Sequence, residues 1–114
     1  MVNTASGAGL VAYPGQAPYV SSKHGVLGLT KTAALEYGRR GVRVNAVCPG
    51  TVLTPMVETA IAQQGIEDAL IALHPIGRIG TAEEVANAVL WLCSDDASFV
   101  LGHALSVDGG YVVP

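Results

Sequence analysis

A long helical pattern between two short strand patterns constrains this chain more than any other feature of its sequence. Apolar residues recur at helical spacing over residues 18–37, with Pro18 suited to the first helical turn. Residues 1–5 form a short β-like run, and residues 42–48 are rich in β-branched valine and are followed by Pro49 and Gly50. A strand, a helix and a second strand in this order predict a βαβ unit with parallel strands.

The remaining segments continue the alternation of helices and strands. Residues 54–73 predict one or two short helices joined near Gly65. Thr81 and Glu84 have the spacing of a capping box at the start of the next helix. Residues 104–107 predict a final short strand. The whole order predicts an α/β fold, a parallel sheet covered by helices.

Composition limits the size and the partners of this fold. The chain has 114 residues, of which 50% are hydrophobic and 13% are charged, and its net charge is −3. Ordinary globular domains carry about 25% charged residues. We therefore expect one domain or part of one, with its apolar excess buried in a core, against a partner subunit or against further sequence. Arg39 and Arg40 form the only basic block, which argues against nucleic acid as a partner.

Membrane spans and metal sites are excluded on similar grounds. Charged residues, glycines and prolines interrupt every apolar run before the roughly 18–20 residues that a membrane span needs. Cys48, Cys93 and the three histidines lack metal-ligand spacing, so we expect no metal site. Reduced cysteines and the lack of a signal-peptide pattern at the N-terminus predict a cytoplasmic protein.

Residues 7–12 read Gly-Ala-Gly-Leu-Val-Ala and match the G-x-G-x-x-A pattern of dinucleotide-binding loops. That pattern requires a helix to begin inside the glycines, so that its N-terminus meets the pyrophosphate. Tyr13, Pro14 and Gly15 follow immediately and stop a helix. We therefore reject the match and interpret residues 6–15 as a turn-rich loop.

Tyr19 and Lys23 carry the clearest chemical signal in the chain. Residues four apart on a helix lie on the same face, so this spacing holds a phenol beside an ammonium group. A free tyrosine has a pKa of about 10, and a fixed cation nearby lowers it toward the range of an acid–base catalyst. The alternative interpretation is an ordinary pair of surface residues.

Ser6 follows the first predicted strand, and the carboxyl ends of parallel strands are where open α/β sheets bind ligands. The helix that begins at Pro18 must return alongside this strand end. We therefore expect the Ser6 hydroxyl, the Tyr19 phenol and the Lys23 ammonium to surround one small volume. The alternative for Ser6 is a turn hydroxyl that bonds its own backbone.

Four motifs, in order along the chain, together resemble those of the short-chain dehydrogenase/reductase family. They are Asn-Thr-Ala-Ser at residues 3–6, Tyr-x-x-x-Lys at 19–23, Asn-Ala-Val-Cys-Pro-Gly at 45–50 and Val-Asp-Gly-Gly at 107–110. The resemblance implies an α/β, Rossmann-like, doubly wound parallel sheet. Residues 1–114 would form its C-terminal catalytic half, with about three strands and their covering helices, and the N-terminal dinucleotide-binding half would be absent.

The resemblance implies a role for each residue of the suspected catalytic group. Tyr19 would be the general acid/base that exchanges a proton with the substrate oxygen. Lys23 would lower the pKa of Tyr19 and bind the nicotinamide ribose, so that both residues would also contact the cofactor. Ser6 would hydrogen-bond the same substrate oxygen and stabilise its charge during the reaction.

Residues 49–54 are similar to the family's cofactor-binding segment, P-G-x-[VI]-x-T. In the family, the backbone at the position of Val52 meets the nicotinamide carboxamide, and the hydroxyl at the position of Thr54 lies near the cofactor. The implied cofactor-binding residues, besides Tyr19 and Lys23, are therefore Pro49, Gly50, Val52 and Thr54.

The implied function is an NAD(P)-dependent oxidoreductase that interconverts a secondary alcohol and a ketone. NAD and NADP both remain open, because the residue that reads the ribose 2′ position lies outside this sequence. Met56 falls in the family's variable substrate loop and either lines the substrate pocket or simply packs. Residues 57–73 carry only three charges, all acidic, which favours an uncharged alicyclic or aliphatic alcohol, or a carrier-bound 3-oxoacyl group.

The partners implied by the resemblance are a small-molecule alcohol or ketone and further copies of the chain. Family members are commonly dimers or tetramers, so we expect a homodimer or homotetramer that pairs through the helix with Gly25 and Gly28 and through the last strand. The alternative function is a truncated, non-catalytic fragment, or an oligomerisation module, of such an enzyme.

Overall fold

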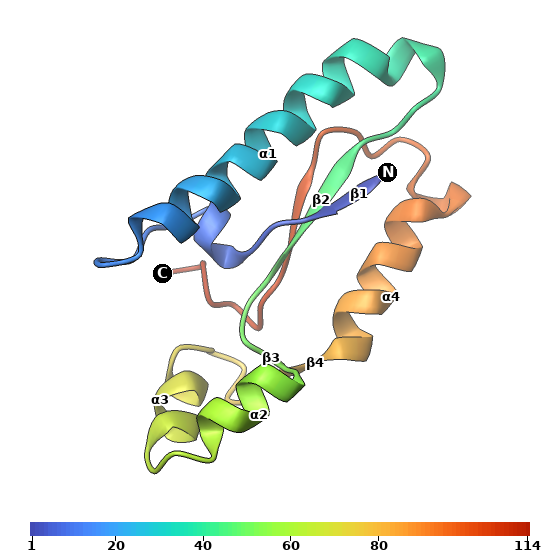
Figure 1. Cartoon of the computed structure of the whole chain (residues 1–114). Helices are drawn as coiled ribbons and strands as arrows, with labels where there is room; N and C mark the ends of the chain where they lie inside the picture. The colour runs from blue at the N-terminus through green and yellow to red at the C-terminus, as the bar shows by residue number, and fades with distance from the viewer.

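The computed structural model describes residues 1–114, and its central feature is the predicted βαβ unit (Figure 1). Strand β1 (Val2–Thr4), helix α1 (Ala17–Tyr37) and strand β2 (Asn45–Pro49) follow one another, and β1 pairs with β2 in parallel. Strand β5 (Ala104–Val107) pairs with the other side of β2, also in parallel. The sheet order is therefore β1-β2-β5, and the predicted α/β class is confirmed.

Helices cover both faces of this sheet. α1 lies along one face and α4 (Ala82–Cys93) along the other (Figure 1). The strands direct their carboxyl ends toward two short helices, α2 (Pro55–Ile61) and α3 (Ile66–Ala72). Gly65, with a φ of 82°, separates these helices at the predicted position. The end of the sheet that α2 and α3 adjoin is the end where open α/β sheets bind ligands.

The prediction of a strand over residues 42–48 was wrong at both ends, because β2 begins at Asn45 and includes Pro49. Pairing with the neighbouring strands sets these bounds: Val2 lies opposite Asn45, and Val107 lies opposite Pro49. A strand forms only where a neighbouring strand pairs with it, and the β-branched residues before Asn45 lie outside the paired segment. Their composition alone therefore placed the strand too early.

A second, two-stranded sheet was not predicted from the sequence. β3 (Val52–Leu53) pairs in parallel with β4 (Gly80–Thr81). Each strand has only 2 residues, which is too short for an alternating pattern to be recognised. The pair joins the segment after β2 to the start of α4 and so fixes where the chain enters and leaves α2 and α3.

Predictions made from short, local sequence patterns are confirmed. Thr81 Oγ1 accepts a hydrogen bond from the Glu84 N–H at 3.3 Å, and Glu84 Oε2 accepts one from the Thr81 N–H at 2.8 Å, which completes the capping box. The dinucleotide-like pattern opens no long helix, because α1 begins only at Ala17. The chain also contains three short 3₁₀ turns: η1 (Gly7–Gly9), η2 (Gly38–Arg40) and η3 (Asp95–Ala97).

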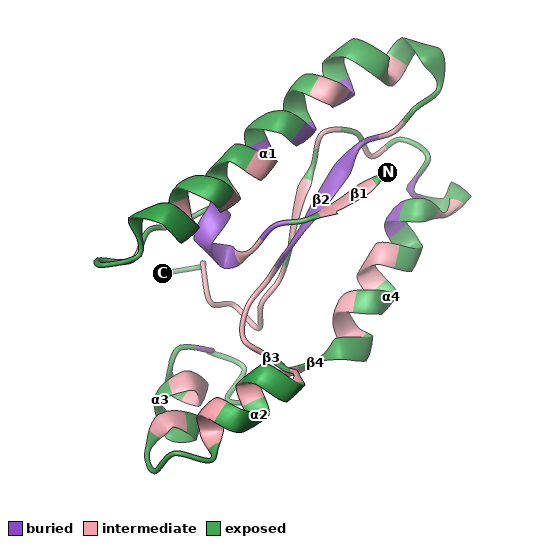
Figure 2. Cartoon of the chain, viewed as in Figure 1, coloured by how far each residue is buried: buried purple, intermediate pink, exposed green.

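The buried core is small and centred on β2 (Figure 2). Only 15 of the 114 residues are buried, and Ala46, Val47 and Cys48 of β2 are fully so. Leu27 of α1 packs with Ala46 and Cys48 in this core, and α4, which contributes the buried Leu92, also contacts β2. Many large apolar side chains stay exposed, so the chain by itself does not bury its apolar excess.

The outer face of α1 is unpartnered within the chain. Leu29 and Leu35 are 65% and 85% exposed, and nothing lies within 4 Å of a Cβ atom built on Gly25 or Gly28. The helix face with these two glycines, through which we expected copies of the chain to pair, therefore has no close neighbour inside this chain. None of the helices combines the length and the hydropathy needed to span a lipid bilayer.

Candidate active site

A cleft of about 890 Å³ opens at the carboxyl ends of the parallel strands, between the start of α1 and the helices α2 and α3. It is lined by 22 residues, and Lys23 is the only charged one among them. All of the site residues predicted from the sequence line this one cleft: Ser6, Tyr19, Lys23, Pro49, Gly50, Val52, Thr54 and Met56. The fold thus gathers groups that are spread over the first half of the sequence.

Tyr19 and Lys23 lie on consecutive turns at the start of α1 and face each other, as their spacing predicts. The Lys23 Nζ atom stands 5.7 Å from the centre of the Tyr19 ring. Arg78 and Glu84 form the only ion pair of the chain, so no carboxylate neutralises Lys23. An unpaired ammonium group beside a phenol therefore faces the cleft.

Ser6 follows β1 and caps the 3₁₀ turn η1. Its Oγ atom accepts a hydrogen bond from the Ala8 N–H at 3.1 Å. As an acceptor, the hydroxyl therefore bonds the backbone of its own turn, as the alternative interpretation of Ser6 predicts. The Ser6 O–H remains available as a donor. The same turn packs closely on α1, because a Cβ atom on Gly9 would lie 3.0 Å from the Lys23 carbonyl oxygen. This packing holds the Ser6 turn beside the start of α1.

The segment after β2 forms the opposite wall of the cleft. The Gly50 N–H donates to the Val107 carbonyl at 3.1 Å, which continues the ladder between β2 and β5. Val52 then enters β3. The Thr54 Oγ1 atom accepts a hydrogen bond from the Val57 N–H at 3.3 Å and so caps α2. Thr54 therefore has a structural contact in addition to its place in the cleft.

The helices α2 and α3 give the cleft an apolar wall. Met56 is 80% exposed on α2 and lines the cleft, so it does not pack in the core. The other apolar residues of this wall are Val57, Ala60, Ile66, Leu70 and Leu73. No lysine or arginine on α2 or α3 could bind an anionic substrate, since these helices contain neither residue.

Tyr13 and Tyr111 also line the cleft and were not predicted as site residues. Their ring centres are 6.0 Å apart, and the Tyr111 ring lies 5.3 Å from that of His74. Burial, with the neighbouring Tyr111 phenol as a smaller cause, raises the pKa of Tyr13 above its usual range. No local spacing signals Tyr111, because its place depends on the fold of the C-terminal segment.

Asp108 sets the path of that segment. Its two carboxylate oxygens accept hydrogen bonds from the Gly110 N–H at 3.0 Å and the Val112 N–H at 3.1 Å. This places the Tyr111 ring against Gly7, where a Cβ atom would lie 3.3 Å from the ring. The terminal Asp-Gly-Gly motif thus brings a third aromatic side chain to the cleft.

Two residues for which the sequence indicated no metal-ligand spacing are buried close to the cleft. Cys48 lies in the centre of β2, and burial raises the pKa of its thiol. His74 is 3% exposed, and both of its ring nitrogens make hydrogen bonds to the protein backbone. Neither residue is free to bind a metal or a substrate.

Known proteins match this chain in sequence along almost its whole length. A family model described as enoyl-(acyl carrier protein) reductase matches residues 1–112. The 2,5-dichloro-2,5-cyclohexadiene-1,4-diol dehydrogenase of Sphingobium indicum is 51% identical over 112 residues, which cover 97% of this chain and 45% of that enzyme. The chain therefore spans about half the length of the curated relatives it matches.

Solved structures match the fold equally well. The structure of ElxO with NADP bound has a TM-score of 0.93 at 39% identity, and the match covers 99% of this chain and 46% of ElxO. A 4-hydroxyisoleucine dehydrogenase complexed with NADH has a TM-score of 0.95 at 34% identity, with the same coverage. The predicted Rossmann-like α/β class is thereby confirmed. The chain belongs to the short-chain dehydrogenase/reductase family.

Proposed function

We propose that this chain carries the catalytic part of an NAD(P)-dependent oxidoreductase that interconverts a secondary alcohol and a ketone. The observation that carries the proposal is the convergence of Ser6, Tyr19 and Lys23 on one cleft whose only charged group is Lys23. Ser6 reaches the cleft from the end of β1, and the other two residues reach it from α1.

The residues present fit a nicotinamide cofactor. The free Lys23 ammonium and the Tyr19 hydroxyl suit the hydroxyl groups of a ribose. The backbone from Pro49 to Val52 and the Thr54 hydroxyl would hold the nicotinamide end. When bound, the cofactor would supply or accept the hydride. Both NAD and NADP stay within the proposal, because solved relatives hold NADP or NADH.

The protein groups would manage the proton on the substrate oxygen. The Tyr19 hydroxyl would donate a proton to a ketone oxygen, and in the reverse direction the Tyr19 phenolate would take a proton from an alcohol. The Ser6 O–H, free on its donor side, would hydrogen-bond the same oxygen and stabilise the charge that develops on it. Lys23, whose Nζ atom stands 5.7 Å from the centre of the Tyr19 ring, would place a positive charge beside the site of proton transfer.

The lining of the cleft supports an uncharged and largely apolar substrate. α2 and α3 contribute only apolar side chains to the cleft, and neither helix carries a lysine or arginine that could bind a phosphate or carboxylate. The Sphingobium indicum relative is named as a dehydrogenase of an alicyclic diol. We therefore propose an alicyclic or aliphatic secondary alcohol as the substrate class.

We also propose that residues 1–114 correspond to the C-terminal catalytic half of a Rossmann domain. The coverage of 45% of the Sphingobium indicum relative and 46% of the solved structures supports this assignment. It also accounts for the small core and for the exposed apolar side chains. Further sequence, a second copy of the chain, or both would then cover the apolar surface.

The substitution Tyr19→Phe tests the proposed function in the longest form of the protein that its gene encodes. Removing the hydroxyl removes the proton donor and keeps the ring, so kcat should fall by at least about 100-fold. Tyr37→Phe, at the other end of α1 and outside the cleft, is the matched control. Retained turnover in Tyr19→Phe would disprove the assigned role.

A non-catalytic fragment or oligomerisation module is the second candidate function. The free edge of β1, which pairs only with β2, and the exposed apolar face of α1 favour it. Titration of the purified chain with NADH and NADPH, followed by nicotinamide fluorescence, separates the two candidates. No binding at millimolar cofactor would support the non-catalytic role for the chain by itself.

We propose in addition that the protein forms a homodimer or homotetramer through α1. Exposed Leu29 and Leu35 and the open space beside Gly25 and Gly28 support this face as a contact between helices. The variant Leu35→Glu should then lower the molar mass measured by light scattering after size exclusion. An unchanged oligomer, or a wild-type monomer, would contradict the proposal.

A further inference from the structure

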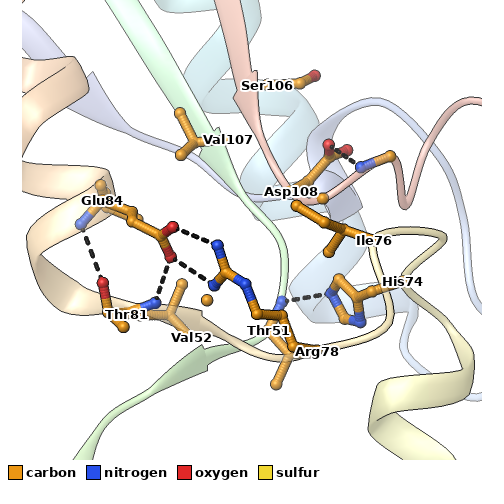
Figure 3. A pocket seen from close by; sticks show the side chains of 14 residues that line it. Thr51, Val52, His74, Ile76, Arg78, Thr81, Glu84, Ser106, Val107 and Asp108 are labelled. Carbon is orange, nitrogen blue, oxygen red and sulfur yellow. Dashed lines mark hydrogen bonds and ion pairs between the residues drawn. The ribbon is translucent and has the colours of Figure 1, made fainter.

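Three segments that are far apart in the sequence meet next to the cleft (Figure 3). They are the turn at Gly50 and Thr51 after β2, the segment from His74 to Ile76 after α3, and the turn at Asp108 and Gly109 after β5. Figure 3 shows the His74 ring pointing at the backbone of Thr51. This junction connects the apolar helices of the cleft to the turn that precedes Val52.

The hydrogen bonds of His74 define the state of its ring. Nε2 lies 3.0 Å from the Thr51 nitrogen, whose N–H can only donate, so Nε2 accepts. Nδ1 lies 2.8 Å from the Leu70 carbonyl oxygen, which can only accept, so Nδ1 carries the proton. The ring is therefore neutral, and it links the last turn of α3 to the backbone after β2.

Close packing leaves this junction little room to rearrange. A Cβ atom on Gly50 would lie 2.7 Å from His74 Nε2 and 3.0 Å from the Asp108 backbone. The Ile76 N–H donates to the Gly109 carbonyl at 3.1 Å, and a Cβ atom on Gly109 would lie 2.6 Å from the Ile76 side chain. The imidazole thus fills a fixed space between two backbone turns.

We propose that His74 is a positioning residue that sets the backbone of Thr51 and Val52 in the cleft from the end of α3. The inference rests on the proposed function, in which the Val52 backbone holds the nicotinamide end of the cofactor. α3 contributes Ile66 and Leu70 to the substrate wall, and Leu70 is also the acceptor for His74 Nδ1. A displacement of Leu70 in this wall would therefore move the His74 ring, and through it the Thr51 backbone on the cofactor side of the cleft.

The two hydrogen bonds can be separated by a matched pair of substitutions. In His74→Asn, the amide nitrogen replaces Nδ1 and keeps the bond to Leu70, but the side chain does not reach Thr51. In His74→Gln, the amide oxygen replaces Nε2 and accepts from the Thr51 N–H. Ile76→Val, which alters the packing of the same junction without touching either bond, is the control.

The experiment measures the Kd for NADH and NADPH by nicotinamide fluorescence, and the exchange rate of the Thr51 amide by NMR. His74→Asn should raise the Kd of the preferred cofactor about tenfold and speed the Thr51 exchange, because the part-buried Thr51 N–H loses its acceptor. His74→Gln and Ile76→Val should stay within about threefold of the wild-type Kd. Equal values for the Asn and Gln variants would overturn the proposal.

Two further readouts keep the outcome decisive. If His74→Asn does not fold, an NMR measurement on the wild-type protein provides the test. Addition of the preferred cofactor should shift the His74 Nε2 resonance, and an unchanged resonance would overturn the proposal. If the wild type binds neither cofactor, the proposed function fails on its own. The Thr51 exchange rates in the Asn and Gln variants then still test the positioning role, and equal rates overturn it.

Discussion

The backbone of Gly9 lies directly against the Lys23 carbonyl, so close that a Cβ atom at this position would stand 3.0 Å from the carbonyl oxygen. The same Cβ atom would also lie 3.1 Å from the Leu27 side chain. The turn that begins at Ser6 is therefore pressed onto the start of α1. The distance between the Ser6 hydroxyl and the Tyr19 phenol depends on this contact.

The substitution Gly9→Ala should separate the Ser6 turn from α1. Added volume in a tight contact typically costs about 1–3 kcal/mol of stability. A displacement of about 1 Å in a catalytic group can lower turnover by up to about 100-fold, so kcat should fall at least tenfold. Urea unfolding and steady-state kinetics measure the two effects. Ser21→Ala, on the exposed side of α1, is the control, and wild-type kcat in Gly9→Ala would refute the prediction.

The substitution Lys23→Met should lower kcat/KM by about 100-fold or more, because it removes the only charge in the cleft and keeps a side chain of similar length. The fluorescence titration should also show weaker cofactor binding. Lys31→Met, on an exposed part of the same helix, tests whether any lost charge on α1 has this effect. Similar losses in both variants would mean that Lys23 has no specific role.

The substitution Asn45→Ala should destabilise the fold by about 2–4 kcal/mol. Asn45 is 1% exposed; its Nδ2 donates to the Val100 carbonyl at 3.0 Å, and its Oδ1 accepts from the His103 N–H at 2.9 Å. Removing the amide leaves both backbone groups without partners. Asn87→Ala, exposed on α4, should change the unfolding free energy by less than about 0.5 kcal/mol.

Acid should remove the contribution of Glu84 to stability. Hydrogen bonds from Arg78, and then from the Thr81 N–H, lower the pKa of Glu84 from its usual 4.5 to about 2. Because the folded-state pKa is the lower one, the stabilisation is complete above about pH 4.5 and disappears as the pH falls toward 2. The difference in unfolding free energy between the wild type and Glu84→Gln should shrink over this range.

The matched control for this pH dependence is Glu83→Gln, one residue earlier in the same helix turn. Glu83 makes neither the bond to Arg78 nor the bond to the Thr81 N–H. Chemical unfolding between pH 2 and pH 6 compares the three proteins. A constant difference between the wild type and Glu84→Gln across this range would contradict the prediction. Because the Arg78–Glu84 pair is exposed, added salt should also reduce the difference.

The sequence by itself determined the features that depend on nearby residues. The Tyr19–Lys23 pair faces one side of α1 because four residues make about one helical turn. The capping box of Thr81 and Glu84 and the strand at residues 104–107 also follow from short, local patterns. The family motifs added the expectation that Ser6, the Tyr19–Lys23 pair and residues 49–54 serve one site.

Only the tertiary structure decided how distant backbones approach one another. The start of β2 at Asn45, the pairing of β3 with β4 and the hydrogen bond from Thr51 to His74 each need a partner from far along the chain. The same is true of Tyr111 in the cleft and of Gly9 on α1. Backbone pairing and close packing depend on where chain segments meet in space, which local spacing does not encode. The sequence therefore supplied the chemical groups, and the packing of the βαβ unit brought them to one cleft.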